Sequence, residues 1–210
     1  VCILAHVDHG KTTMTDSLLA ANGIISHKQA GRLRYLDSRE DEQERGITME
    51  SSAITLLYDD LRGGGSEDGV KLRRYLINLI DSPGHVDFAG QVVTASQLCD
   101  GAVVVVDAVE GVCAQTMAVL RQAHRERLHL TLVINKIDRL VSELRMGTAE
   151  AARCLFRLVE HVNAVQGTID KDGDAEVFDP AGGNVLLASA TDGWACSLGH
   201  FARLYSSRLG

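Results

Sequence analysis

The residues that most clearly suggest chemistry form a run from Ala5 to Thr13, Ala-His-Val-Asp-His-Gly-Lys-Thr-Thr, directly after the apolar residues 1–4. A buried strand that enters a loop ending in Gly-Lys-Thr, where a helix begins, is typical of a phosphate-binding loop. Backbone N–H groups and the positive end of the helix surround the phosphate. Lys11 would meet the β- and γ-phosphate oxygens, and the Thr12 hydroxyl would bind Mg²⁺. Ala5 stands where the usual pattern has glycine, so the motif needs support from elsewhere in the chain.

Two later motifs can complete a phosphate and Mg²⁺ site. Thr48 ends the run Arg-Gly-Ile-Thr and can offer Mg²⁺ a second hydroxyl when a γ-phosphate is present. Asp81 begins the run Asp-Ser-Pro-Gly-His after an apolar stretch. Its carboxylate can hold Mg²⁺ through a water, while the N–H of Gly84 can meet the γ-phosphate. Each motif is weak by itself, since an isolated Thr48 would be an ordinary surface threonine.

Two motifs near the end of the chain point to guanine as the base. In Asn-Lys-Ile-Asp, residues 135–138, the Asp138 carboxylate can accept the paired N1–H and N2–H donors of guanine, which adenine lacks. Ser189 and Ala190 follow the last predicted strand, and a backbone N–H there can donate to guanine O6. All five motifs lie at the ends of predicted strands, where open α/β sheets bind ligands. Their order predicts one guanine-nucleotide site.

The elements that must position these motifs alternate between strand and helix patterns. We predict a P-loop NTPase of the α/β class, with a mostly parallel six-stranded sheet between helix layers and one antiparallel strand. The strands at 53–58 and 75–80 leave no room for a helix between them and should pair as a hairpin, while 62–69 and 170–183 are predicted surface loops. The predicted strands are 1–5, 53–58, 75–80, 101–106, 131–134 and 185–187, and the predicted helices are 13–21, 87–98, 115–125, 148–165 and 196–206.

Other polar groups favour simpler interpretations. His6 and His9 have i, i+3 spacing, but within a phosphate loop they are better explained as backbone-setting or surface residues than as zinc ligands. Asp107 and Glu110 indicate a turn. The charged segment 37–45 is either a solvated surface or a mobile loop facing the phosphates. Five cysteines without C-x-x-C spacing indicate free thiols in a reducing compartment.

Size and composition fit one α/β domain. The chain has 210 residues, 45% of them hydrophobic and 23% charged. A net charge of −7 disfavours nucleic-acid binding by bulk attraction. No apolar run approaches the roughly 20 residues of a membrane span, so no membrane partner is expected. Because Val1 already lies in the first predicted strand, we expect residues 1–210 to be an excerpt of a longer multidomain protein.

With these residues in view, the chain resembles the GTP-binding domain of translational GTPases, and more narrowly that of the elongation factor 2 group. The resemblance covers essentially the whole chain and rests on residues 5–13, 41–48 and 81–88, with 107–112, 135–139 and 192–194 extending it. Within the group, residues 22–26, 33–40, 183–185 and 189–194 favour the elongation-factor-like GTPases of cytoplasmic large-subunit maturation over elongation factor 2.

The resemblance implies a GTP hydrolase that uses GTP, GDP and Mg²⁺. His85 would orient the attacking water behind a gate formed by Val7 and Ile47, and Asp8 would hold a monovalent cation. Loops 30–50 and 82–89 would move when the γ-phosphate is lost. The expected catalytic residues are His85, Lys11, Thr48 and Asp8; the expected nucleotide-binding residues are Val7, Asp8, His9, Gly10, Lys11, Thr12, Thr13, Gly84, Asn135, Lys136, Asp138, Ser189 and Ala190; and the expected Mg²⁺ ligands are Thr12, Thr48 and Asp81.

The resemblance also implies a cytoplasmic, monomeric protein that acts on the large ribosomal subunit. There it would drive release of the anti-association factor, initiation factor six, together with a Shwachman–Bodian–Diamond-type protein. One alternative is elongation factor 2, which would drive translocation with the same nucleotide chemistry. Another is a non-catalytic, GTP-dependent scaffold on the ribosome, against which the intact Lys11, Thr12, Thr48, Asp81 and His85 argue. An ATP-using phosphoryl transferase fits the Asn-Lys-Ile-Asp motif poorly.

Overall fold

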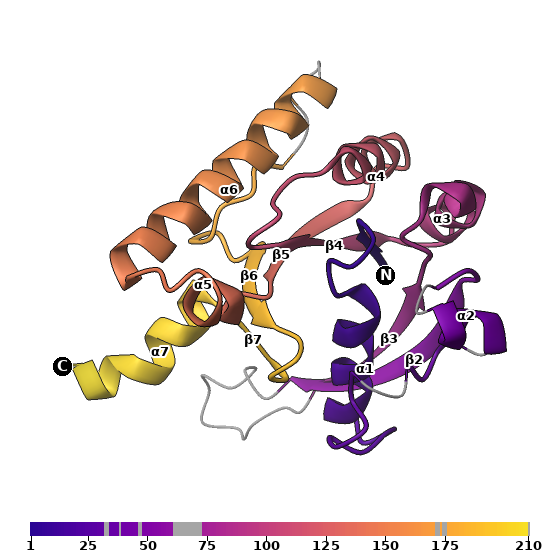
Figure 1. Ribbon diagram of the computed structural model, residues 1–210, viewed down its shortest axis with the longest axis horizontal. Helices are drawn as coiled ribbons and strands as arrows, with labels where there is room; N and C mark the ends of the chain where they lie inside the picture. The colour runs from indigo at the N-terminus through magenta and orange to yellow at the C-terminus, as the bar shows by residue number, and fades with distance from the viewer. Residues whose placement is uncertain are drawn as a thin grey trace.

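A mixed sheet with the strand order β2-β3-β1-β4-β5-β6-β7 crosses the centre of the molecule (Figure 1). This computed structural model describes residues 1–31, 34–37, 39–45, 48–60, 73–170, 173 and 176–209. The strands are β1 (Cys2–Ala5), β2 (Ser52–Asp60), β3 (Arg73–Asp81), β4 (Gly101–Asp107), β5 (His129–Asn135), β6 (Val185–Ser189) and β7 (Trp194–Ser197). The helices are α1 (Lys11–Ala21), α2 (Glu40–Arg45), η1 (Val86–Phe88), α3 (Ala89–Gln97), α4 (Ala114–Arg125), α5 (Asp138–Ser142), α6 (Thr148–Ile169) and α7 (Leu198–Leu209).

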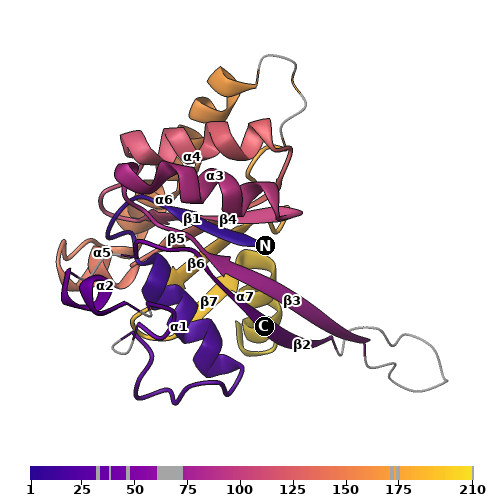
Figure 2. The same cartoon turned by 90° about the vertical axis from the view of Figure 1, so that its right-hand side faces the viewer.

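Helices cover both faces of the sheet, with α3, α4 and α6 on one face and α1 and α7 on the other (Figures 1 and 2). The central strands are therefore buried on both sides, which explains their unbroken runs of Val, Ile and Leu. In β4, Val105 packs toward the α1 core, whereas Val104 and Val106 pack toward α4 and α6. The predicted α/β fold between helix layers is confirmed.

The predicted hairpin is confirmed and longer than expected. Strands β2 and β3 pair antiparallel from Ser52 with Asp81 to Asp60 with Arg73, and they extend away from the body of the molecule (Figure 2). Asn22, at the end of α1, uses its side-chain amide to pair with both the N–H and the C=O of Leu57. This contact occupies part of the open edge of β2 and fixes the hairpin relative to α1. The predicted loop 62–69 lies outside the described residues.

The prediction of six strands with one antiparallel member is wrong, because the described residues form seven strands and both edge strands are antiparallel. The additional strand, β7, includes residues 196 and 197, which we expected to begin the last helix. A turn supported by the Ser189–Asp192 hydrogen bond and by Gly193 at φ +73° folds β7 back onto β6. Four residues are too few for a recognisable strand pattern, so pairing with β6 decides the conformation.

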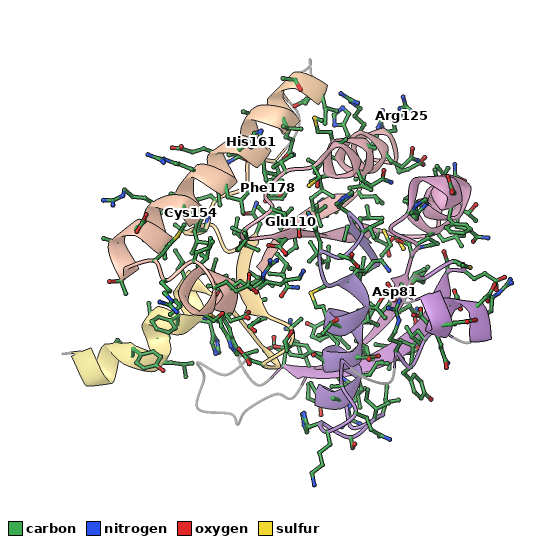
Figure 3. All side chains as sticks on the ribbon, viewed as in Figure 1. Asp81, Glu110, Arg125, Cys154, His161 and Phe178 are labelled. Carbon is green, nitrogen blue, oxygen red and sulfur yellow. The ribbon has the colours of Figure 1, made fainter. Side chains whose placement is uncertain are left out.

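The segment 170–183 is not simply a surface loop. Phe178 is buried among the apolar residues under α6 (Figure 3). The side chain of Asn163 on α6 holds the backbone of Phe178 through two hydrogen bonds, at 2.8 and 2.9 Å. Residues 171, 172, 174 and 175 of this segment lie outside the described part. A single aromatic residue in an Asp- and Gly-rich stretch was too weak a signal to predict this anchor.

Two further observations bear on the sequence predictions. No helix among the described residues is long and apolar enough to cross a membrane. All five cysteines are free thiols, as expected.

Leucine substitutions at two strand positions test the core. Leu132 is 0% exposed at the centre of β5, whereas Leu76 on β3 is 71% exposed. We expect Leu132→Ala to lower the free energy of unfolding by about 2–5 kcal/mol, because it leaves a cavity between α6 and the sheet. Leu76→Ala should change it by no more than about 0.5 kcal/mol. Urea unfolding followed by circular dichroism measures both, and equal effects would contradict the described core.

Candidate functional site

The predicted motifs converge at the edge of the sheet where its parallel strands end. A cavity of about 320 Å³ opens there. It is lined by His6, Val7, Asp8, Gly10, Lys11, Thr12, Thr13, Arg34, Thr48, Gly84, His85 and Lys136. The cavity thus brings the phosphate loop together with Thr48, Gly84 and His85. Of the other predicted residues, His9, Asp81, Asn135, Asp138, Ser189 and Ala190 are not among the lining residues.

The phosphate loop leaves β1 and reaches α1 through Gly10, whose φ is +91°. A Cβ at this position would lie 2.3 Å from Nδ2 of Asn135, so only glycine fits. The Asn135 amide occupies that space and donates to the carbonyl of His9 at 2.9 Å. Gly84 also lies against the loop, but a Cβ there would be 3.4 Å from the carbonyl oxygen of Ala5, which is an ordinary contact. Packing and backbone conformation therefore explain the glycine at position 10 but not the one at position 84.

Lys11 and Asp81 form a buried ion pair, with Nζ and Oδ1 3.0 Å apart. Burial raises the pKa of Asp81; Lys11 opposes this effect, while the nearby charges of Asp37 and Asp16 add to it. The second oxygen, Oδ2, is buried without a hydrogen-bond partner among the described residues. A buried acceptor without a partner requires a donor, and a metal-bound water would provide one.

The hydroxyls of Thr12 and Thr48 face each other at 3.0 Å. Thr48 donates its proton to Oδ1 of Asp37 at 2.9 Å, and Asp37 also accepts from Nε of Arg34. Because the single proton of the Thr48 hydroxyl goes to Asp37, the lone pairs of the Thr48 oxygen face the Thr12 hydroxyl. Two hydroxyls and a carboxylate are the hard oxygen donors that Mg²⁺ prefers, so these residues fit the predicted ion.

Three buried carboxylates hold the segment between α1 and β2 against the site, and the sequence did not predict their roles. Besides Asp37, Asp16 accepts the backbone N–H groups of Gly31, Arg34 and Tyr35. Glu42 accepts those of Arg39, Met49 and Glu50. Burial raises the pKa of Asp16, whereas at Glu42 the effect of burial is outweighed by these backbone donors and the pKa is lowered. The charged segment 37–45 is therefore only partly a solvated surface.

On the base side, Asn135 joins two loops. Besides donating to His9, it accepts the N–H of Ala190 at 3.0 Å. The Ala190 N–H is thus engaged within the protein, and its predicted bond to guanine O6 stays a prediction. Ser189 is buried and bonds Asp192 at 2.9 Å. Oδ1 of Asp138 is buried without a partner among the described residues, at the position predicted to accept guanine donors.

The buried His9 lies beside the exposed Glu110 and the half-buried Cys113, and the potential ligand atoms of the three residues lie within 4.8 Å of one another; Figure 3 labels Glu110. Nδ1 of His9 accepts the backbone N–H of Asp107 at 3.2 Å. If Nε2 bound a metal, the neutral ring would carry its proton on Nδ1, and that proton would point at the N–H of Asp107. Burial and the adjacent His6 lower the pKa of His9. His9 is therefore better explained as a neutral, hydrogen-bonded histidine than as a metal ligand.

His85 lies at the cavity with its ring partly exposed. Its Nδ1 accepts the backbone N–H of Asp87 at 3.2 Å and lies 3.4 Å from an Asp87 carboxylate oxygen. Val7 also lines the cavity, whereas Ile47, its predicted partner in a gate, lies outside the described residues. Asp8 lies on the rim in the left-handed conformation, with φ +61°. His85, Val7 and Asp8 therefore border one cavity, and the roles predicted for them stay predictions.

Fold and site together define a P-loop guanine-nucleotide-binding domain. The family described as Elongation factor Tu GTP binding domain matches residues 1–205. The chain therefore belongs to this family of GTP-binding domains, as its motifs predict.

Within this family, the chain is similar to proteins named for ribosome assembly and for likeness to elongation factors. The chain is 49% identical to Ribosome assembly protein 1 of Saccharomyces cerevisiae, with all of the chain and 21% of that protein aligned. It is 55% identical to Ribosome assembly protein 1 of Schizosaccharomyces pombe over 99% of the chain and 22% of that protein. It is 48% identical to Elongation factor-like GTPase 1 of Homo sapiens over all of the chain and 21% of that protein. The chain thus spans about a fifth of the length of these relatives.

A solved structure agrees with the fold. A crystal structure of a protein from Thermus thermophilus superposes with a TM-score of 0.60 at 25% identity, over 79% of this chain and 22% of that one. The predicted P-loop fold and the predicted resemblance to elongation-factor-like GTPases are confirmed by these comparisons.

Two glycines with similar backbone angles test the phosphate loop. Gly10→Ala should weaken GDP binding by about tenfold or more, or about 1.4 kcal/mol, because its Cβ displaces Asn135. Gly23 has φ +73° but open space around it, so Gly23→Ala should cost roughly 1–2 kcal/mol of stability without changing affinity. Calorimetric titration with GDP and Mg²⁺ measures the affinities. Unchanged binding by Gly10→Ala would contradict the proposed phosphate site.

Proposed function

We propose that this chain is the GTP-binding domain of a longer GTPase, which binds GTP and GDP with Mg²⁺ and hydrolyses GTP on the large ribosomal subunit. The main support is that two acceptors without partners among the described residues, on Asp81 and Asp138, lie at the positions predicted for Mg²⁺ and guanine. The aligned relatives are named for ribosome assembly and for GTPase character, which supports the same function.

Guanine recognition follows from the carboxylate of Asp138. Its buried Oδ1, which has no partner in the described part of the chain, would accept an N–H donor of guanine, and its other oxygen would accept the second. Adenine has no pair of donors at this edge, so an ATP complex would leave this acceptor unsatisfied at a cost of about 1–3 kcal/mol. Lys136, two residues before Asp138, lines the cavity beside the phosphate loop, and Asn135 holds the loop against the phosphate loop.

Phosphate binding would use the loop amides, Lys11 and Mg²⁺. Lys11 would exchange part of its contact with Asp81 for the β- and γ-phosphate oxygens. Thr12 and Thr48 would hold Mg²⁺ directly and Asp81 would hold it through water. When bound, the ion neutralises charge that develops on the phosphates. Because Thr48 lies on the segment held by Asp37 and Glu42, its position can report the presence of the γ-phosphate.

Hydrolysis requires mainly positioning and charge stabilisation. His85 borders the cavity beside Gly84 and would orient the attacking water. Val7, on the opposite loop, would form an apolar side of its gate. Asp8 would hold a monovalent cation at the rim, adding positive charge near the phosphates.

The cellular step that we propose is release of initiation factor six from the pre-large subunit, in the cytoplasm and together with a Shwachman–Bodian–Diamond-type protein. Sequence resemblance to the maturation GTPases and the names of the relatives support this step. The protein would act there as a monomer.

Single-turnover GTP hydrolysis with and without purified large subunits tests the proposal. A wild-type protein that binds GTP without measurable hydrolysis would favour the scaffold alternative.

Replacing His85 tests its role in hydrolysis. His85→Ala should lower ribosome-stimulated turnover by roughly 10²–10⁴-fold, as expected for loss of the group that orients the water. GTP affinity should stay nearly unchanged, because the phosphate loop is intact. His129→Ala, exposed at the start of β5 on the opposite edge of the sheet, is the control. Wild-type turnover by His85→Ala would refute the role of His85.

Replacing Asp138 tests the base specificity. Asp138→Asn should bind xanthosine triphosphate better than GTP, because an amide can donate to the xanthine 2-oxo group and accept its N1–H. The wild type should show the reverse preference. Asp100→Asn, an exposed change just before β4, should keep the wild-type preference. Competition of both nucleotides against fluorescent GDP gives the ratio, and an unchanged ratio in Asp138→Asn would place the base elsewhere.

A further inference from the structure

We infer that Asp107 is a positioning residue that holds Lys136 in place and thereby slows release of the bound guanine nucleotide. The inference rests on the proposed nucleotide site. The sequence suggested only a turn here, and the described residues do form a turn after β4. The contacts of the carboxylate go well beyond turn formation.

Asp107 is fully buried at the end of β4 and uses both carboxylate oxygens. Oδ1 accepts the backbone N–H groups of Val109 and Glu110, at 2.7 and 3.2 Å, and so closes the turn. Oδ2 receives two cations, Nζ of Lys136 and Nη1 of Arg139, each at 2.9 Å. One oxygen therefore shapes its own loop, and the other binds the guanine-recognition loop and α5.

Two further features restrict the position of Lys136. Its backbone is in the left-handed conformation at φ +60°, which is uncommon for a lysine. Its ammonium also donates to the carbonyl of Asp8 in the phosphate loop. Lys136 therefore bridges the phosphate loop and the guanine loop while it lines the cavity. The charge that holds its ammonium in this bridge belongs to Asp107.

Asp107 also contacts the phosphate loop directly, through its backbone. Its N–H donates to Nδ1 of His9, next to the carbonyl that Asn135 binds. Burial alone would raise the pKa of Asp107, but the donors from Lys136, Val109 and Glu110 outweigh burial and lower it. The group is therefore charged at neutral pH. Asp107 is fully buried, whereas the Lys136 side chain is 24% exposed. Without the Asp107 charge, the Lys136 ammonium keeps only the Asp8 carbonyl among its contacts in the described residues.

The chain offers a matched pair of substitutions. Asp107→Asn removes the buried charge and keeps the shape, so the turn can still form. Glu143→Gln makes the same change in charge at an exposed carboxylate that binds the other side of Arg139 at 2.9 Å without contacting Lys136. In the full-length protein, we expect Asp107→Asn to accelerate release of a fluorescent GDP analogue at least about tenfold, and Glu143→Gln by less than about twofold.

A double-mutant cycle separates positioning from general stability. If Asp107 acts through Lys136, Asp107→Asn should add less than about twofold to the release rate in a Lys136→Met background. A merely structural role would give the same factor in both backgrounds, which would overturn the inference. Asp107→Ser, which can still accept the Val109 N–H, is the second variant. Loss of folding in both Asp107 variants would also overturn it, since Asp107 would then act on the fold.

The outcomes also separate this inference from the proposed function. If the wild type binds no guanine nucleotide, the proposed function fails. If the wild type binds GDP and Asp107→Asn releases it at the wild-type rate, only the role of Asp107 fails.

Discussion

The Asn135 side chain makes the hydrogen bonds on which the site depends. Parallel strands fix one another through backbone hydrogen bonds, but the loops at their ends have no such ladder and need side chains to join them. Asn135 donates to His9 and accepts from Ala190, so it joins the loops after β1, β5 and β6. The absence of a Cβ at Gly10 makes room for its amide. The Asp107–Lys136 pair beside it connects the loop after β4 to the loops after β5 and β1.

The buried acids around the site differ in whether their oxygens have hydrogen-bond partners within the protein. Asp16 and Glu42 are satisfied by backbone N–H groups, and Asp37 by Thr48 and Arg34. Asp81 keeps one oxygen without a partner among the described residues, as does Asp138 on the base side. Since buried acceptors are normally paired, these two atoms support the proposal that Asp81 and Asp138 bind ligands, whereas the other acids hold the fold.

Much of the fold could be predicted because its strongest signals are local. Apolar runs such as 101–106 are buried on both faces, and their Val-rich composition is typical of a parallel sheet between helices. The hairpin followed from the short spacing between two strands. Strand β7 and the short helices α2 and α5 could not be predicted in this way. Strand β7 depends on pairing with β6, Glu42 in α2 accepts backbone N–H groups up to eight residues further along the chain, and Leu140 in α5 packs in the core under α6. Phe178 was missed because its burial depends on Asn163, fifteen residues earlier in the chain.

The sequence by itself determined the order of the ligand motifs and the position of most of them at the end of a strand, since both follow from residue type and periodicity. Thr48 is the exception, because it lies between α2 and the start of β2. It also determined the family, because those motifs are specific in combination. Only the tertiary structure decided which acids act together. Asp37 meets Thr48, and Asp107 meets Lys136, through folding that brings together residues 11 and 29 positions apart. The burial of these acids and their pairing with distant partners depend on the folded structure, so no local pattern in the chain predicts them.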